Sequence, residues 1–250
     1  MADDKVAVVT ASGQGIGAGV ARGLHAKGYR LALMSPSGRS IALANELGCV
    51  GLNGSVTEPA DLEALVGTAL DEYGHIDAVC ANTGLEEWGV GSDSRGIAFN
   101  PDLESNLLDV TDEGWIGGLD LLFMYAVRLA RLVTPHMLER GKGAIVNISS
   151  EAAHAPMLEY PLTSTIRTGL SAFTKLYSDK YSRHNIRMNT VMVGYASNLG
   201  FPPEVSRCIP MQRPGSMEEA AGIVALLFSD DAAYITGENL MWDGGLARGL

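Results

Sequence analysis

Short apolar runs alternate with longer stretches of helical spacing along the whole 250-residue chain. Several runs are apolar at successive positions, as strands buried on both faces of a parallel sheet are. The runs are Val6–Thr10, Arg30–Met34, Ile76–Cys80, Ala144–Ile148, Arg187–Val193 and Leu240–Trp242. The stretches between them are Ile16–Lys27, Asp61–Tyr73, Trp115–Glu139, Thr165–Arg183 and Met217–Phe228. This β-α-β-α order predicts one α/β domain over residues 1–250: a doubly wound parallel sheet with helices on both faces and a ligand crevice at the carboxyl ends of the strands.

One long segment interrupts the alternation. Residues 85–112 are rich in Gly, Ser, Asp and Asn and are long for a strand-to-helix connection. We expect a loop insertion that serves as a lid or as a subunit contact. A solvated insertion without a role is an equally good interpretation.

The charge balance limits the partners of this chain. It has 29 acidic and 18 basic residues, and the resulting net charge of −11 opposes binding to nucleic acid or to an anionic membrane. The N-terminus lacks the pattern of a secretory signal, and no apolar run is long enough to span a bilayer. Cys49, Cys80 and Cys208 are widely spaced without a CxxC pair, which favours a reducing, cytoplasmic location and no metal site.

A glycine-rich turn follows the first expected strand and leads into the first helix. It reads Thr10-Ala11-Ser12-Gly13-Gln14-Gly15-Ile16-Gly17. Glycines at this place let the backbone approach a pyrophosphate, and the helix N-terminus offers free N–H groups with a positive dipole end. The turn therefore predicts a dinucleotide site, although a glycine cluster also fits a simple tight connection.

Several ordered motifs resemble those of the short-chain dehydrogenases/reductases, and they extend over essentially the whole chain. The family's Thr-Gly-x-x-x-Gly-x-Gly turn is similar to residues 10–17, with Ala11 in place of the first glycine. The remaining motifs resemble Asn82-Thr83-Gly84, Ile145-Val146-Asn147-Ile148-Ser149-Ser150, Asn189-Thr190-Val191-Met192-Val193-Gly194, Thr236-Gly237 and Asp243-Gly244-Gly245.

The resemblance implies a Rossmann-type fold that binds a nicotinamide dinucleotide. The contacts would come from the glycine turn and from the carboxyl ends of the strands. The implied residues are Ser12, Gln14, Gly15, Ile16, Gly17, Ser35, Arg39, Ser55, Val56, Asn82, Gly84, Arg167 and Gly194. Small-molecule substrates and a homodimer or homotetramer are also implied.

The catalytic positions depart from the family pattern. The family tyrosine stands thirteen residues after the serine, which from Ser150 leads to Thr163, and the lysine four residues later is Arg167. The family asparagine, seven residues after Trp115, is Leu122. Of the four usual catalytic residues only Ser150 is present.

These replacements change the proton chemistry. The aliphatic hydroxyl of Thr163 is a far weaker acid than a phenol, so it can donate a hydrogen bond but scarcely act as an acid or base. Arg167 has no acceptor and stays charged, so it can clamp ribose hydroxyls or an anionic substrate group but cannot relay a proton. A shifted loop could bring the phenol of Tyr160 toward Ser150. His154 and Glu159 are further titratable candidates on that segment, although charged loop residues are usually just solvated.

The end of the second strand bears on the choice of cofactor. Ser35 stands where an NAD-binding member has a carboxylate for the ribose 2′-hydroxyl. Nearby hydroxyls and Arg39 could receive a 2′-phosphate instead, which favours NADP over NAD unless Arg39 simply points to water. Ser55-Val56 replaces the Asp-Val pair that the family often has beside adenine.

Two functions from different classes stay open. One is an NAD(P)(H)-dependent oxidoreductase for a carbonyl or secondary alcohol, with Ser150 polarising the oxygen and Tyr160 or water as proton donor. The other is a relative without dehydrogenase activity: a lyase, isomerase or dehydratase, or a regulatory dinucleotide-binding protein. Residues 195–215 stand where the family has its substrate lid and suggest a partly apolar ligand, whereas the tail Leu246–Leu250 either reaches a neighbouring subunit or frays.

Overall fold

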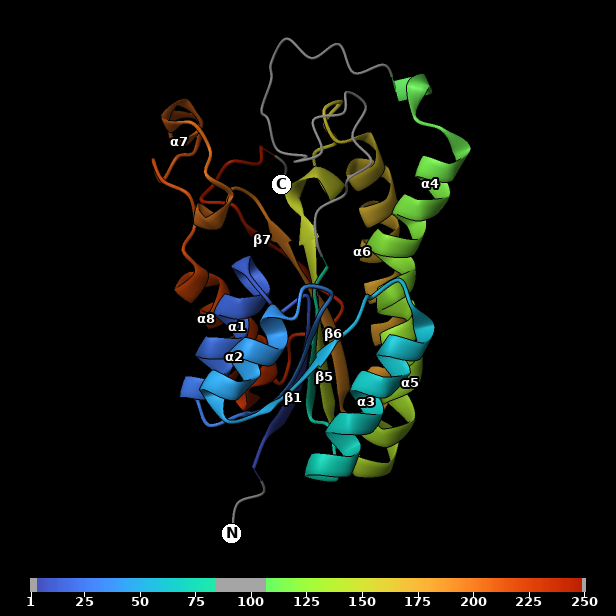
Figure 1. The fold of residues 1–250 in the computed structure, drawn as a ribbon. Helices are drawn as coiled ribbons and strands as arrows, with labels where there is room; N and C mark the ends of the chain where they lie inside the picture. Colours follow the sequence, from blue (N-terminus) through green and yellow to red (C-terminus); the bar gives the residue numbers. More distant parts are fainter. Residues whose placement is uncertain (1–3, 84–106, 249–250) are drawn as a thin grey trace.

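The computed structural model describes residues 4–83 and 107–248, which form a parallel sheet between two layers of helices (Figure 1). Seven strands lie in the order β3-β2-β1-β4-β5-β6-β7, and all their pairings are parallel. The strands are β1 Val6–Thr10, β2 Arg30–Ser35, β3 Val50–Asn53, β4 Ala78–Ala81, β5 Gly143–Ser150, β6 Ile186–Val193 and β7 Asn239–Trp242. This arrangement confirms the predicted single-domain, Rossmann-type α/β fold.

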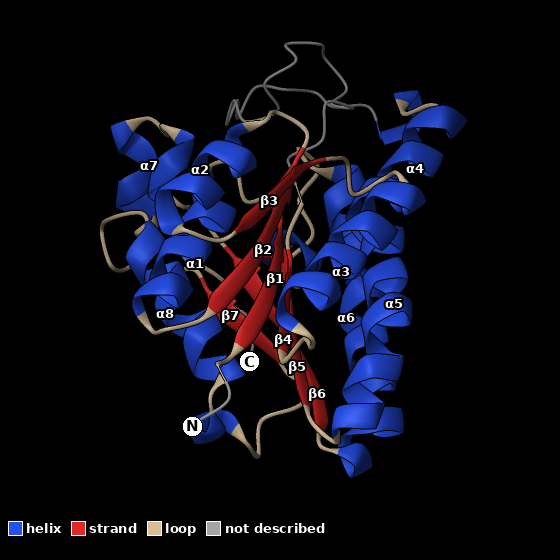
Figure 2. Ribbon diagram, turned by 60° about the horizontal axis from the view of Figure 1, so that its bottom comes forward, coloured by secondary structure: helices blue, strands red, loops and turns tan. Residues whose placement is uncertain are grey.

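The helices cover both faces of the sheet, as Figure 2 shows. On one face lie α1 Gly15–Ala26, α2 Arg39–Leu47 and α8 Met217–Phe228, with α7 Pro203–Cys208 beyond the carboxyl ends of the strands. On the other lie α3 Pro59–Tyr73, α4 Asp112–Leu119, α5 Tyr125–Arg140 and α6 Pro161–Tyr181. Short 3₁₀ turns cover Leu107–Asp109, Glu151–Ala153, Ser182–His184, Ser197–Leu199 and Asp230–Ala232. None of the described helices combines the length and the apolar character that crossing a membrane requires.

Each face of the sheet has its own apolar core. One core joins Val9 and Leu33 of the sheet to Leu24 of α1 and Val224 of α8. The other joins sheet residues to Leu65 of α3 and to helices α5 and α6. Successive residues of β1 enter opposite cores, which explains why the whole strand is buried and apolar.

The sequence pattern assigned no residue range to three elements: β3, α2 and α7. Strand β3 lies at the edge of the sheet, is only partly buried, and contains Gly51, so it lacks a continuous apolar run. A Cβ on Gly51 would lie 2.6 Å from the Cβ of Ala44, so this glycine allows α2 to pack closely on the edge strand. Most of the expected 85–112 loop insertion lies outside the described residues; its end forms the 3₁₀ turn and the start of α4.

The expected helix over Trp115–Glu139 is interrupted by a π-helical segment, Asp120–Met124, between α4 and α5. Leu122 lies in this segment and is 1% exposed. It packs with Leu162 and Ile166 of α6. A widened turn thus places an apolar side chain between two helices at the position of the family asparagine.

The predicted ligand crevice falls where the chain reverses its direction of growth across the sheet. From β1 the chain proceeds through β2 to the edge strand β3, and α3 then brings it back to β4 on the other side of β1. The carboxyl ends of β1 and β4 therefore border the topological switch point, at which open α/β sheets bind their ligands. The glycine turn follows β1 at this point.

The glycine turn yields a stability prediction. A Cβ on Gly17 would lie 2.2 Å from the backbone oxygen of Ala11, which cannot move without displacing the turn. We expect Gly17→Ala to lower the free energy of unfolding by about 2–3 kcal/mol through overpacking. Gly67, inside α3, has nothing within 4 Å of such a Cβ, and Gly67→Ala should raise it by about 0.5–1 kcal/mol. Urea denaturation of both variants checks this, and equal effects would contradict it.

Candidate active site

The glycine turn has the backbone geometry of an anion cradle. Gly15 has φ +54°, a left-handed conformation that favours glycine. Helix α1 begins there, and its N-cap Gln14 makes no side-chain capping hydrogen bond, so the first N–H groups of the helix remain available to a ligand. Ala11, in place of the first family glycine, also has a positive φ of 47°. The sequence departs from the family here while the backbone conformation remains one that glycine would favour.

The floor of the crevice is held by hydrogen bonds between β1 and the end of β4. The Thr10 hydroxyl donates to the Asn82 carbonyl at 2.6 Å and accepts from the Asn82 N–H at 3.0 Å. The side-chain amide of Asn82 donates to the Ala11 carbonyl at 3.4 Å. Asn82 therefore fixes the glycine turn against β4, which is a structural role at a residue expected to contact the cofactor.

Two buried hydroxyls near this floor have no hydrogen-bond partner among the described residues. They belong to Thr83, just after β4, and to Ser149, at the end of β5. A buried polar group without a partner costs free energy, so native structures usually satisfy it with a ligand or water. Together with the glycine cradle, these hydroxyls fit a polar ligand that lies across the carboxyl ends of the strands.

The end of β2 brings Ser35 and Arg39 beside the turn. A Cβ on Gly13 would lie 2.6 Å from the Ser35 hydroxyl oxygen, so the two are in close contact. That hydroxyl is buried and accepts from the Ser40 N–H at 3.3 Å, whereas the exposed Arg39 guanidinium donates to the side-chain oxygen of Gln14. Arg39 is therefore the accessible cation at the expected position of the ribose.

The other expected cofactor residues lie around the crevice with different contacts. The Ser12 N–H donates to the Met34 carbonyl at 3.1 Å, and Ile16 packs against the apolar core beneath α1. Ser55 donates its N–H to Asp61 at 2.8 Å, and Val56 is buried in the core on the α3 side. Gly194 lies so close to the end of β7 that a Cβ would be 2.8 Å from the Cβ of Asp243.

Gly84 lies outside the described residues. The contacts of Val56 and Gly194 are those of packing, so their direct contact with a cofactor stays a prediction.

Ser150 ends β5 and lies next to a buried carboxyl group. Its hydroxyl donates to a carboxylate oxygen of Glu151 at 3.0 Å and accepts from the Ala152 N–H at 3.2 Å. Glu151 is only 8% exposed. Burial raises the pKa of Glu151, and the Ser150 hydrogen bond only partly offsets this. The only usual catalytic residue that the sequence preserves is thus paired with an acid.

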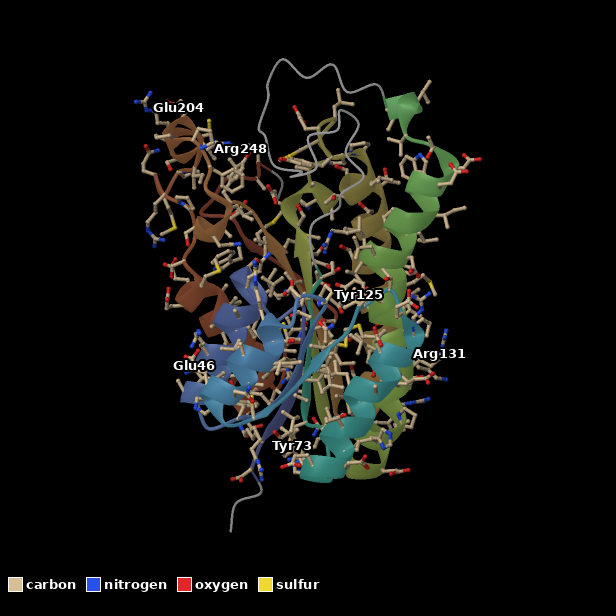
Figure 3. All side chains as sticks on the ribbon, viewed as in Figure 1. Glu46, Tyr73, Tyr125, Arg131, Glu204 and Arg248 are labelled. Atoms are coloured by element: carbon tan, nitrogen blue, oxygen red, sulfur yellow. The ribbon has the colours of Figure 1, made fainter. Side chains whose placement is uncertain are left out.

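Arg167 is directed to the sheet. It is 7% exposed, and its guanidinium donates to the Ile148 carbonyl of β5 at 2.6 Å. Thr163, one helical turn earlier on the same face of α6, is half-buried. Tyr125 of α5 lies in the middle of the molecule in Figure 3, and burial raises the pKa of its phenol to about 12. Arg167 lies close enough to offset part of this rise. The structure therefore brings Thr163 and Arg167 to the end of β5, with Arg167 occupied by a backbone contact.

Tyr160 is the N-cap residue of α6 and is half-buried. Burial, followed by the charges of Glu151 and Glu159, raises the pKa of its phenol. In the family, by contrast, a neighbouring lysine lowers the pKa of the tyrosine phenol. Glu159 and His154 are both exposed.

A cavity of about 340 Å³ adjoins Glu151. Its wall is largely apolar, and its lining comes from the segments after β5 and β6, from α7 and from the C-terminal tail. The lining residues are Glu151, Ala155, Met157, Tyr195, Val205, Cys208, Leu246, Ala247 and Arg248. Figure 3 shows Arg248 and Glu204 at the end of the molecule that bears α7.

The C-terminal tail is held in place over this cavity. The Asp243 carboxylate accepts from the Gly245 N–H at 2.9 Å and from the Ala247 N–H at 2.7 Å. Residues up to Arg248 therefore belong to the pocket wall, which neither of the two sequence interpretations of the tail anticipated.

Sequence reasoning also missed Glu151. The sequence did contain a signal: this carboxylate directly follows the serine, within the apolar segment at the end of a buried strand. Solvated acidic residues seldom occupy such a position.

Comparisons with known proteins agree with this geometry. A family model described as Enoyl-(Acyl carrier protein) reductase matches residues 10–247. The human protein Dehydrogenase/reductase SDR family member 4 is 32% identical over 257 residues, which cover 97% of this chain and 87% of the relative. Oxidoreductase UcpA of Salmonella typhimurium is 29% identical over 265 residues, which cover 96% of this chain and 94% of the relative. The chain belongs to the short-chain dehydrogenase/reductase family, a family of oxidoreductases that use a nicotinamide dinucleotide.

The packing of Leu122 yields a second prediction. Leu122→Asn introduces the family residue, but it would bury an amide among Leu162 and Ile166 and lose apolar contacts. We expect a cost of about 2–4 kcal/mol in the free energy of unfolding. Leu138, near the end of α5, is 40% exposed, and Leu138→Asn should cost less than about 1 kcal/mol. Urea denaturation compares the two, and a tolerated Leu122→Asn would show that the segment can accept a polar group.

Proposed function

We propose that this chain is an NAD(P)(H)-dependent oxidoreductase that acts on a carbonyl or secondary alcohol through an atypical site without the usual tyrosine and lysine. The main support is the glycine turn, where left-handed Gly15 and tightly packed Gly17 begin an uncapped helix at the switch point of the sheet. The unpartnered hydroxyls of Thr83 and Ser149 add polar groups on the same edge. The dinucleotide would supply or accept a hydride there.

The residues of this chain would divide the work as follows. Gln14, Gly15, Ile16 and Gly17 present backbone N–H groups to the pyrophosphate. Ser150 donates a hydrogen bond to the reacting substrate oxygen and stabilises the charge that develops on it. The buried charge of Arg167 provides a positive potential at the end of β5, where such an oxygen would lie.

The substrate class follows from the cavity. Met157, Val205 and Leu246 make its wall largely apolar, and Arg248 adds one cation. We propose a small, partly apolar substrate, with residues 195–215 and the C-terminal tail as the cover that excludes water.

Two further properties belong to this proposal. The exposed apolar side chains Ile116 and Leu119 of α4 and Leu176 of α6 support association through these helices into a homodimer or homotetramer. Cys49, Cys80 and Cys208 are free thiols, which agrees with a reducing cytoplasm.

The activity is tested by binding and turnover together. Fluorescence titration should show binding of NADPH or NADH, and a panel of aldehydes, ketones and conjugated enones should include compounds that cause loss of the nicotinamide absorbance. Ser150→Ala should lower kcat roughly 100-fold, as expected for a lost donor to a developing oxyanion, without weakening nucleotide binding. Ser229→Ala, at the C-terminal end of α8, is the control.

If both nucleotides bind and no compound is turned over by the unchanged protein, the oxidoreductase proposal is wrong. The chain would then be a non-redox relative, that is a lyase, isomerase, dehydratase or regulatory dinucleotide-binding protein. If neither nucleotide binds, the cofactor proposal fails as well.

We propose NADP rather than NAD as the preferred cofactor, because Arg39 is exposed beside the turn and no carboxylate stands at Ser35. Arg39→Ala should weaken NADPH binding about 10-fold or more, since a hydrogen bond between charged groups is lost, and NADH binding by less than about twofold. Arg22→Ala removes another exposed arginine, which is paired with Glu46, and should leave the ratio of the two affinities unchanged. An equal loss for both nucleotides in Arg39→Ala would contradict the preference.

A further inference from the structure

Glu151 is the buried acid that the proposed function has not used. It belongs to the 3₁₀ turn directly after β5, is 8% exposed, and lines the cavity of about 340 Å³. One carboxylate oxygen accepts the Ser150 hydrogen bond at 3.0 Å. No lysine, arginine or histidine forms an ion pair with it among the described residues. The carboxyl group is thus in contact both with the serine and with the space for a substrate.

The groups that face Glu151 come from every neighbouring element. Asp243, after β7, disfavours its charged form, and Arg167 of α6 favours it, but burial is the largest influence and raises its pKa. Burial is the main cause that raises the pKa values of the Tyr160 and Tyr195 phenols, that of Tyr195 to about 12, and the nearby charge of Glu151 adds to both. These surroundings favour a carboxyl group that holds a proton at higher pH than an ordinary glutamate does.

The geometry points to Glu151 as the residue that supplies the proton for carbonyl reduction, through the hydroxyl of Ser150. This inference rests on the proposed oxidoreductase function and assigns the role that the family gives to a tyrosine.

The step balances as a simple reduction. The carbonyl carbon accepts a hydride from the reduced nicotinamide, and the carbonyl oxygen takes the proton of the Ser150 hydroxyl. Ser150 recovers a proton from the Glu151 carboxyl group, which becomes a carboxylate and later takes a proton from water. The products are the alcohol, the oxidised dinucleotide and an unchanged protein.

The competing donors are weaker acids. The pKa of the Tyr160 phenol is raised above its ordinary value of 10, and the Thr163 hydroxyl is less acidic still. General acids work best with a pKa near the working pH, and a buried glutamate is closer to this than either hydroxyl. The position of Glu151 beside Ser150 also places its proton two hydrogen bonds from the substrate oxygen, with the Ser150 hydroxyl between them.

The central test compares Glu151→Gln with Glu63→Gln. Glutamine preserves the size of the side chain and removes the titration, and Glu63 is an exposed glutamate of α3, outside the cavity and outside the proposed cover. With NADPH and the best carbonyl of the panel, Glu151→Gln should lower kcat roughly 100-fold or more with an unchanged Kd for NADPH. Glu63→Gln should behave like the unchanged protein.

The pH profile separates proton supply from mere positioning. In the unchanged protein, kcat for reduction should fall as pH rises through the pKa of Glu151, because the protonated form is consumed. In Glu151→Gln the slow residual rate should lack this fall. Glu151→Asp, which retains an acid, should recover part of the rate.

A second readout needs neither nucleotide nor substrate. A carboxyl group whose pKa is raised on folding destabilises the native state above its unfolded pKa, so the unchanged protein loses stability as pH rises from about 4.5 through the folded pKa. The urea midpoint of Glu151→Gln should therefore exceed that of the unchanged protein by an amount that grows over this pH range and then levels off. Glu63→Gln should show no such pH-dependent difference.

Each outcome distinguishes the two proposals. Reduction by Glu151→Gln at the normal rate, or a Tyr160→Phe variant that alone abolishes reduction, overturns the inference and leaves the oxidoreductase function standing. A urea-midpoint difference that stays constant or shrinks with rising pH also overturns the inference. Nucleotide binding without turnover of any carbonyl by the unchanged protein overturns both.

Discussion

The contact between Gly17 and the Ala11 carbonyl is the constraint on which the rest of the site depends. Because no Cβ fits there, helix α1 begins directly beneath the turn, and its free N–H groups face the switch point between β1 and β4. The Asn82 amide also donates to this carbonyl, so the turn is fixed to both strands that border the crevice. The left-handed conformation of Ala11 is maintained by this packing rather than by a glycine. Dinucleotide binding therefore depends mainly on backbone geometry, which a few small residues secure.

On the opposite side of the crevice, side chains rather than backbone groups determine the chemistry and the packing. In place of the usual relay, α6 presents a threonine and an arginine, and the arginine is committed to the Ile148 carbonyl. The π-helical segment has an apolar contact, Leu122 against Leu162 and Ile166, where the family holds a polar group. These changes form one consistent packing arrangement between α4, α5 and α6. Restoring a single family residue would therefore introduce a polar group without a partner.

The sequence was sufficient for the fold class and for the glycine turn, because buried parallel strands and a glycine-rich connection leave local patterns. It was insufficient for features that depend on contacts between distant parts of the chain. The range of β3 could not be assigned, because an edge strand with Gly51 is stabilised by α2 rather than by an apolar run of its own. The break at Asp120–Met124 has no sequence mark comparable to proline. The place of the tail over the cavity depends on Asp243, whose two hydrogen bonds to the tail cannot be inferred from composition.

Dinucleotide binding and proton supply depend on different residues in this fold, so one can change without the other. The cradle depends on Gly15 and Gly17, which tolerate few alternatives, whereas the acid needs only a titratable group within one hydrogen bond of Ser150. Helix α6 is one source of such a group, and the 3₁₀ turn after β5 is another, since its first residue is already next to the serine. Burial at that position raises the pKa of a carboxyl group, so the group keeps its proton closer to the working pH. The same burial would lower the pKa of a lysine and disfavour its charged form. A chain that loses the tyrosine and lysine of α6 therefore retains, in Glu151, a place where an acid can act without any change to the dinucleotide cradle.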